Sequence, residues 1–276
     1  MPTAAKVVIR AEAGLAYEEV GGTKNVHYGA AEKQVMDIYA AALAGSPLVV
    51  LIHGGGWVSG DKSGQTAIAK KLNEQGFAVF NINYRWASYP SPEAFPMEVE
   101  DTQKATEYAI AHAASYNAST SKVFIVCGSA GGQLGAQAAI QLNEATAELV
   151  HGVTMLSGAT DLWQLVVEKR GFGNDLAEAL GCKEIGAETA TPEKEALAKL
   201  WSPSRHLVAS SKPIAWQLFE SAGSELMPKS QYEEMKAAIE ALGGSSVTGR
   251  LVPGTQHSYA YFSEVETEIY NFIRSH

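Results

Sequence analysis

The segment Val123-Phe-Ile-Val-Cys127-Gly128-Ser129-Ala130-Gly131-Gly132-Gln-Leu134 decides the fold. Its apolar run from Val123 to Cys127 is bounded by turn-forming residues, which is typical of a buried parallel strand. Small residues continue from 133 to 140 and predict a helix. The sequence therefore predicts a tight strand-to-helix turn with Ser129 at its corner and the serine hydroxyl above the edge of the sheet.

A serine at such a corner stands beside the first backbone N–H groups of the following helix. These N–H groups and the positive end of the helix dipole favour an anion that forms on a molecule bound to the serine. The glycines of the turn remove side chains that would clash there. The alternative for an isolated Ser-Ala-Gly-Gly is an ordinary helix N-cap serine.

A second glycine-rich turn follows another apolar run, 47–52, which predicts a central strand. The turn reads His53-Gly54-Gly55-Gly56-Trp57. Three successive glycines cost conformational entropy, so a chain keeps them where its backbone must approach another group closely. We expect the N–H groups of Gly55 and Gly56 to bind a developing oxyanion. A flexible turn is the alternative.

The last predicted strand, 246–252, leads through Pro253-Gly254-Thr-Gln to His257. Of the seven histidines, His257 is the one that follows the last strand through a Pro-Gly turn. These three stretches together resemble the α/β-hydrolases, and within them the hormone-sensitive-lipase-like and small carboxylesterase group with H-G-G-G-W and G-x-S-A-G-G type motifs. Aryl formamidases are close relatives of that group. Cys127 and Gly128 depart from its usual glycine and aspartate.

The resemblance, which runs from about residue 34 to the C-terminus, implies an α/β-hydrolase fold. Its sheet is mainly parallel and eight-stranded, with flanking helices and a small helical cap. Residues 1–276 form a single catalytic domain in this interpretation, and 161–205 form the cap insertion.

The implied function is that of a carboxylesterase-type serine hydrolase that forms an acyl-enzyme on Ser129. His257 is the base, and the N–H groups of Gly55, Gly56 and Ala130 hold the oxyanion. Trp57 lies beside the pocket wall and contacts substrate. His53 precedes the serine in the chain, so it fits a loop-bracing role better than that of the base. No cofactor is required, and activity should rise with pH near 6.5, the ordinary pKa of histidine.

The acid of the triad is the position where the chain departs most from its relatives. Ser224 occupies the column in which they carry aspartate, and serine cannot act as the acid. Glu225 is its neighbour and is the predicted acid, while Glu220 at the end of the preceding strand is the second candidate. The serine at 224 also motivates a different class of function, a non-hydrolytic ligand-binding protein or a lyase or cyclase with an impaired triad. Within the hydrolases, hydrolysis of an N-formylkynurenine-type amide is the alternative to ester hydrolysis.

Composition limits the partners of the chain. It has 276 residues, 46% hydrophobic and 18% charged, with a formal net charge of −9. These values predict a folded domain and argue against nucleic acid or an anionic membrane as partner. Cys127 and Cys182 predict two free thiols, and no His/Cys spacing predicts a metal site. No apolar run reaches transmembrane length and no signal peptide is recognisable, so we expect a cytoplasmic protein that acts on a small-molecule ester or amide, with a homodimer left open.

Overall fold

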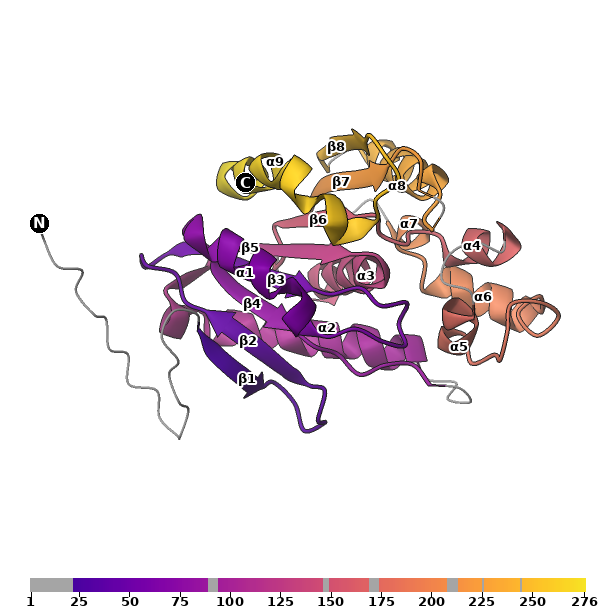
Figure 1. The fold of residues 1–276 in the computed structure, drawn as a ribbon, viewed down its shortest axis with the longest axis horizontal. Helices are drawn as coiled ribbons and strands as arrows, with labels where there is room; N and C mark the ends of the chain where they lie inside the picture. Colours follow the sequence, from indigo (N-terminus) through magenta and orange to yellow (C-terminus); the bar gives the residue numbers. More distant parts are fainter. Residues whose placement is uncertain are drawn as a thin grey trace, which may run out of the picture.

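The computed structural model describes residues 22–88, 94–145, 149–168, 174–207, 213–224, 226–243 and 245–276. Within these ranges the strands form one eight-stranded sheet in the order β1-β2-β4-β3-β5-β6-β7-β8 (Figure 1). The strands are Thr23–His27 (β1), Val35–Tyr39 (β2), Ser46–Ile52 (β3), Ala78–Ile82 (β4), Ala118–Gly128 (β5), Gly152–Leu156 (β6), Ala215–Ser221 (β7) and Val247–Val252 (β8).

Strand direction follows the pattern expected from the sequence. β2 pairs antiparallel with β1 and β4, and the remaining neighbours pair in parallel. The central strands are buried on both faces, so their sequences are continuous apolar runs such as 48–52 and 123–127. The prediction of a mainly parallel eight-stranded sheet is confirmed.

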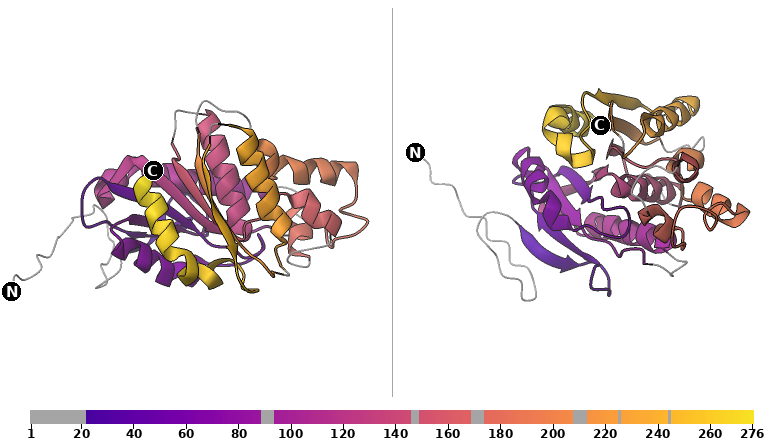
Figure 2. Two further views of the ribbon diagram at one scale, coloured as in Figure 1. Left: turned by 90° about the horizontal axis from the view of Figure 1, so that it is seen from above. Right: turned by 45° about the vertical axis from the view of Figure 1, so that its right-hand side comes forward.

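Helices cover both faces of this sheet (Figure 2). One apolar cluster joins the sheet to α2, α3 and α8, and the other joins it to α1 and α9. These helices are Thr66–Glu74 (α1), Ala94–Ala111 (α2), Ala130–Ala145 (α3), Lys229–Ala241 (α8) and Phe262–Ser275 (α9).

Two of the helices show how sequence sets their place. α9 buries Phe262, Val265, Ile269 and Phe272, spaced three or four residues apart, so one stripe of the helix packs on the sheet. α3 is buried on all sides from Ala130 to Ile140, because its small residues allow the sheet, α2 and the segment after β6 to approach closely.

The segment between β6 and β7 contains four helices in its described part. These are Leu162–Glu168 (α4), Asp175–Ala179 (α5), Pro192–Leu200 (α6) and Pro203–His206 (α7). α4, α5 and α6 lie together at one end of the molecule in Figure 1. Two contacts join the beginning of this segment to its end. The N–H of Leu162 donates to Ser202 Oγ at 2.9 Å, and Asp161 forms an ion pair with Arg205. These contacts stand at the boundaries predicted for the cap, 161 and 205.

Cys127 and Cys182 are buried free thiols, and burial raises the pKa of the Cys127 thiol well above its ordinary value. In the ranges given above, no group of three or more His, Cys, Asp or Glu side chains is arranged to hold a metal ion. None of the helices described combines the length and the apolar character needed to cross a bilayer.

Candidate active site

Ser129 stands at the corner between β5 and α3. Its φ of +56° lies in the left-handed region, which is uncommon for a residue with a side chain and is found where the surrounding structure enforces it. The N–H of Ser129 donates to the carbonyl of Leu156 at 3.0 Å, which ties the corner to the end of β6. α3 begins at the next residue, Ala130, so the predicted strand-to-helix turn is confirmed.

His257 reaches this corner from the other end of the chain. It lies five residues beyond the end of β8, and its Nε2 is 2.9 Å from Ser129 Oγ. With the imidazole proton on Nδ1, Nε2 accepts the serine hydroxyl. The neighbouring Tyr259 anchors the loop, because its hydroxyl donates to the carbonyl of Ile52 at the end of β3, 2.6 Å away.

Burial determines the charge of His257. It lowers the pKa of the imidazole to about 4, which disfavours the imidazolium relative to a histidine in water. His257 is therefore neutral and able to accept a proton at neutral pH. We therefore expect the activity limb, predicted from the sequence near 6.5, at a lower pH.

The glycine-rich turn meets Ser129 because the two preceding strands are neighbours in register. Ile52 of β3 pairs with Cys127 of β5, so both turns emerge at the same edge of the sheet. A Cβ added to Gly54 would lie 2.7 Å from the Cβ of Ser129, a distance that only glycine avoids. Among the residues described, the structure gives the N–H groups of Gly55, Gly56 and Ala130 no acceptor, so they can donate to an incoming oxygen.

His53 holds the turn from behind. Its ring nitrogen Nδ1 lies 2.6 Å from the carbonyl oxygen of Gly54, and the ring stacks on Tyr84 with centroids 4.4 Å apart. Burial lowers the pKa of His53 to about 4. A neutral ring whose Nδ1–H donates to the carbonyl of Gly54 fits the bracing role predicted for His53.

Trp57 does not lie where the sequence analysis placed it. Its side chain is fully buried, with 0% of its surface exposed, and its indole N–H donates to Gln133 Oε1 at 3.0 Å. A φ of +69° at the end of the glycine turn directs the chain so that the ring packs edge-on against Phe95. The expectation that Trp57 contacts substrate is corrected: it supports the turn from the core.

The predicted acid, Glu225, lies outside the described residues. Ser224 accepts the N–H of Met227 at 3.1 Å and so shapes the turn that leads to α8. Glu220, the second candidate, accepts hydrogen bonds from Ser157 Oγ and from the N–H of Ser221, both at 2.8 Å from its Oε1. The carboxyl of Glu220 is therefore engaged by Ser157 and Ser221.

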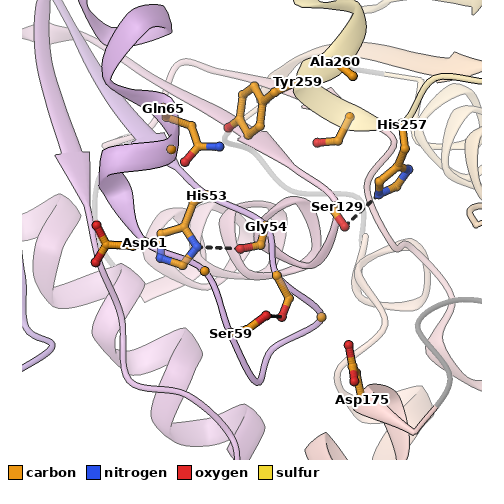
Figure 3. Close-up of a pocket in the computed structure, with 15 residues that line it drawn as sticks. His53, Gly54, Ser59, Asp61, Gln65, Ser129, Asp175, His257, Tyr259 and Ala260 are labelled. Carbon is orange, nitrogen blue, oxygen red and sulfur yellow. Dashed lines mark hydrogen bonds between the residues drawn. The ribbon is translucent and has the colours of Figure 1, made fainter.

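Ser129 and His257 open onto a cavity of about 480 Å³ (Figure 3). Its lining in the described part of the chain combines polar residues with glycines and contains no aliphatic side chain larger than alanine. The lining consists of His53, Gly54, Gly55, Gly56, Ser59, Gly60, Asp61, Gly64, Gln65, Ser129, Asp175, His257, Ser258, Tyr259 and Ala260.

Two groups near the site were missed by sequence reasoning. Ser157 directly follows β6, as Ser129 directly follows the last residue of β5, and its Oγ accepts the N–H of Ser258 at 3.2 Å. Its place at the end of a parallel strand was a signal that could have found it. Asp175 enters the cavity from α5, and no local pattern marks that residue.

Comparison with known proteins assigns the chain to a family. The family model described as BD-FAE matches residues 36–239. A "Versiconal hemiacetal acetate esterase" of Dothistroma septosporum is 33% identical over 127 residues, which is 45% of this chain and 38% of that protein. The "Probable carboxylic ester hydrolase LipM" of Mycobacterium tuberculosis is 25% identical over 223 residues, 78% of this chain and 49% of that protein. The chain thus spans about half or less of the length of these two relatives.

Solved structures share the fold at low sequence identity. A "Truncated form of carbohydrate esterase from gut microbiota" has a TM-score of 0.75 and 20% identity, covering 95% of this chain and 99% of that one. A "Bacterial Heroin Esterase" has a TM-score of 0.70 and 23% identity, covering 87% of this chain and 78% of that one. These likenesses establish the α/β-hydrolase fold for the chain.

Proposed function

The chain belongs to the BD-FAE family, and from that premise we propose that it is a carboxylesterase-type serine hydrolase that forms an acyl-enzyme on Ser129. One observation carries the proposal: the 2.9 Å contact between Ser129 Oγ and a half-buried, neutral His257 at the wall of a cavity. A hydroxyl and a base at this distance form the pair that nucleophilic catalysis needs.

The first chemical step is attack of Ser129 Oγ on the acyl carbon of the ester. Its proton moves to His257 Nε2 as the new C–O bond forms, and the carbonyl oxygen becomes an oxyanion. The imidazolium then gives this proton to the leaving alkoxide, which departs as the alcohol. Water attacks the acyl-enzyme by the same route, returning the proton to Ser129 and releasing the acid.

The oxyanion is held by backbone N–H groups. Ala130 supplies one at the start of α3, and Gly55 and Gly56 supply others from the turn braced by His53. Donors that already point at the site cost no reorganisation when charge develops, and each is worth roughly 10²-fold to 10³-fold in kcat.

The catalytic triad also requires a carboxylate beside His257. We propose that Glu225 orients His257 and stabilises the imidazolium, because Glu220 is already engaged by Ser157 and Ser221. The two curated relatives described above are named for ester hydrolysis, which supports an ester substrate over the formamide alternative and over a non-hydrolytic role. A cytoplasmic location, a homodimer and the absence of nucleic-acid partners stay predictions from the sequence.

The test is Ser129→Ala, assayed on p-nitrophenyl butyrate and by labelling with a fluorophosphonate probe. We expect a loss of about 10⁴-fold or more in kcat and complete loss of labelling, because the nucleophile is absent. Ser121→Ala is the matched control, since Ser121 is exposed on the same strand and loses the same atom. Turnover by Ser129→Ala within tenfold of the unmodified protein would exclude Ser129 as the nucleophile.

A further inference from the structure

The cavity beside Ser129 carries acidic side chains without a basic counterpart. Asp61 and Asp175 belong to its lining, and no lysine or arginine does among the residues that the structure describes. The two carboxylates differ in their hydrogen bonding to the rest of the protein.

Asp61 is a structural anion. Its Oδ1 accepts the N–H of Ser63 at 2.9 Å, and its Oδ2 accepts the side-chain N–H of Asn83 at 2.7 Å. Although burial opposes its ionisation, these bonds hold the pKa of Asp61 at about 2. Its hydrogen-bonding capacity therefore serves the loop that follows the glycine turn.

Asp175 makes no hydrogen bond or ion pair with any other residue in the described part of the chain. It enters the cavity from α5 and is half-buried. In Figure 3 it lies across the cavity from His257, with its carboxylate directed toward the space below Ser129. Burial and the neighbouring Glu178 raise the pKa of Asp175, as expected of a carboxylate that lacks a counter-ion.

The carboxylate of Asp175 lies close to one of the proposed oxyanion donors, so its charge affects the oxyanion. A Cβ added to Gly56 would lie 2.2 Å from Asp175 Oδ2, so the carboxylate is in contact with the backbone of a proposed oxyanion donor. A negative charge there opposes the negative charge that develops on the substrate carbonyl. A positive group on the substrate, placed beside Asp175, would neutralise this opposing charge and would compensate the desolvation of the unpaired carboxylate.

We propose that Asp175 is a specificity-determining residue that selects esters carrying an ammonium group close to the scissile bond. The proposal rests on the function proposed above and names its substrate class. A neutral hydroxyl would supply one hydrogen bond without neutralising the charge, so the cation is the better match. An ester with a carboxylate in the same place would be excluded by repulsion from Asp175.

The test compares two butyrate esters of nearly equal shape. Butyrylcholine carries a quaternary ammonium, and 3,3-dimethylbutyl butyrate has a carbon in place of that nitrogen. We expect kcat/KM to favour the cationic ester by about tenfold at low salt and by less at high salt, because the carboxylate is partly exposed and screened. Asp175→Asn should bring the ratio close to one. Glu184→Gln, which removes an exposed carboxylate outside the cavity lining, should keep it.

A binding measurement separates this inference from the proposed function. Calorimetry with choline and with 3,3-dimethylbutanol should show tighter binding of choline, lost in Asp175→Asn. If neither ester is hydrolysed but choline still binds through Asp175, the ester hydrolase proposal fails and the cation site stands. If the neutral ester is hydrolysed equally well and Asp175→Asn changes neither the ratio nor choline binding, the cation site is refuted and the hydrolase proposal stands.

Discussion

Burial of Glu220 should make the stability of the protein depend on pH. Its carboxyl is 1% exposed at the end of β7, and it accepts hydrogen bonds from Ser157 and Ser221. Those bonds favour the ionised form, but burial outweighs them and raises the pKa of Glu220 from 4.5 to about 8. The change that isolates this effect is Glu220→Gln, which keeps an acceptor oxygen at the same place and cannot ionise.

The free energy of unfolding depends on pH because the folded and unfolded states bind the Glu220 proton differently. Between pH 4.5 and about pH 8 the folded protein keeps the Glu220 proton while the unfolded chain has lost it. The free energy of unfolding therefore falls with rising pH across that window, by about 1.4 kcal/mol per pH unit. Below pH 4.5 the group has no effect, and above pH 8 the full cost is reached, about 5 kcal/mol.

The measurement is urea unfolding of both proteins at pH 5, 7 and 9 and constant ionic strength. We expect the free energy of unfolding of Glu220→Gln, relative to the unmodified protein, to rise by about 4 kcal/mol between pH 5 and pH 9. Glu240→Gln is the control, because Glu240 is exposed on α8 with its partner Lys236 at 3.6 Å, and it should change stability by less than about 0.5 kcal/mol. A difference for Glu220→Gln that stays flat within about 1 kcal/mol would refute the raised pKa.

Three further predictions concern activity. Burial of His257 places its pKa near 4, so kcat/KM should rise with pH through a limb below 6.5, and Glu225→Gln should move that limb lower; a limb at or above 6.5 would contradict the dominance of burial. Glu225→Gln should lower kcat about a hundredfold or more, and Glu220→Gln should change kcat by less than tenfold at pH 7. If Glu220→Gln has the larger effect, Glu220 is the acid of the triad. A strong increase in kcat from Ser224→Asp would indicate that the triad of the unmodified protein is impaired. Butyrate esters should be hydrolysed with a higher kcat/KM than dodecanoate esters, because the described cavity lining has no aliphatic side chain larger than alanine, and a preference for the longer chain in a p-nitrophenyl ester series would exclude this cavity as the acyl site.

The sequence by itself determined the elements and their order. Apolar runs such as 48–52 and 123–127 specify central strands because a parallel strand is covered on both faces. The stripe of α9 specifies a surface helix, and the glycines around Ser129 specify the turn. These signals are local: each depends on residues a few positions apart, so they can be interpreted without knowing where the rest of the chain lies.

Only the tertiary structure decided which side chains meet. Ser129 and His257 are 128 positions apart, and their 2.9 Å contact depends on the strand register and on Tyr259, which anchors the histidine loop to β3. Trp57 follows the glycine turn in sequence but turns into the core, because the sign of one φ angle sets the direction of its side chain. Asp175 reaches the cavity from α5, between β6 and β7, and Leu176 and Ala179 of that helix pack into the large apolar cluster, a long-range placement that no local pattern specifies. Electrostatics behaves in the same way, since the pKa values of Glu220 and His257 depend on burial, which no stretch of sequence specifies alone.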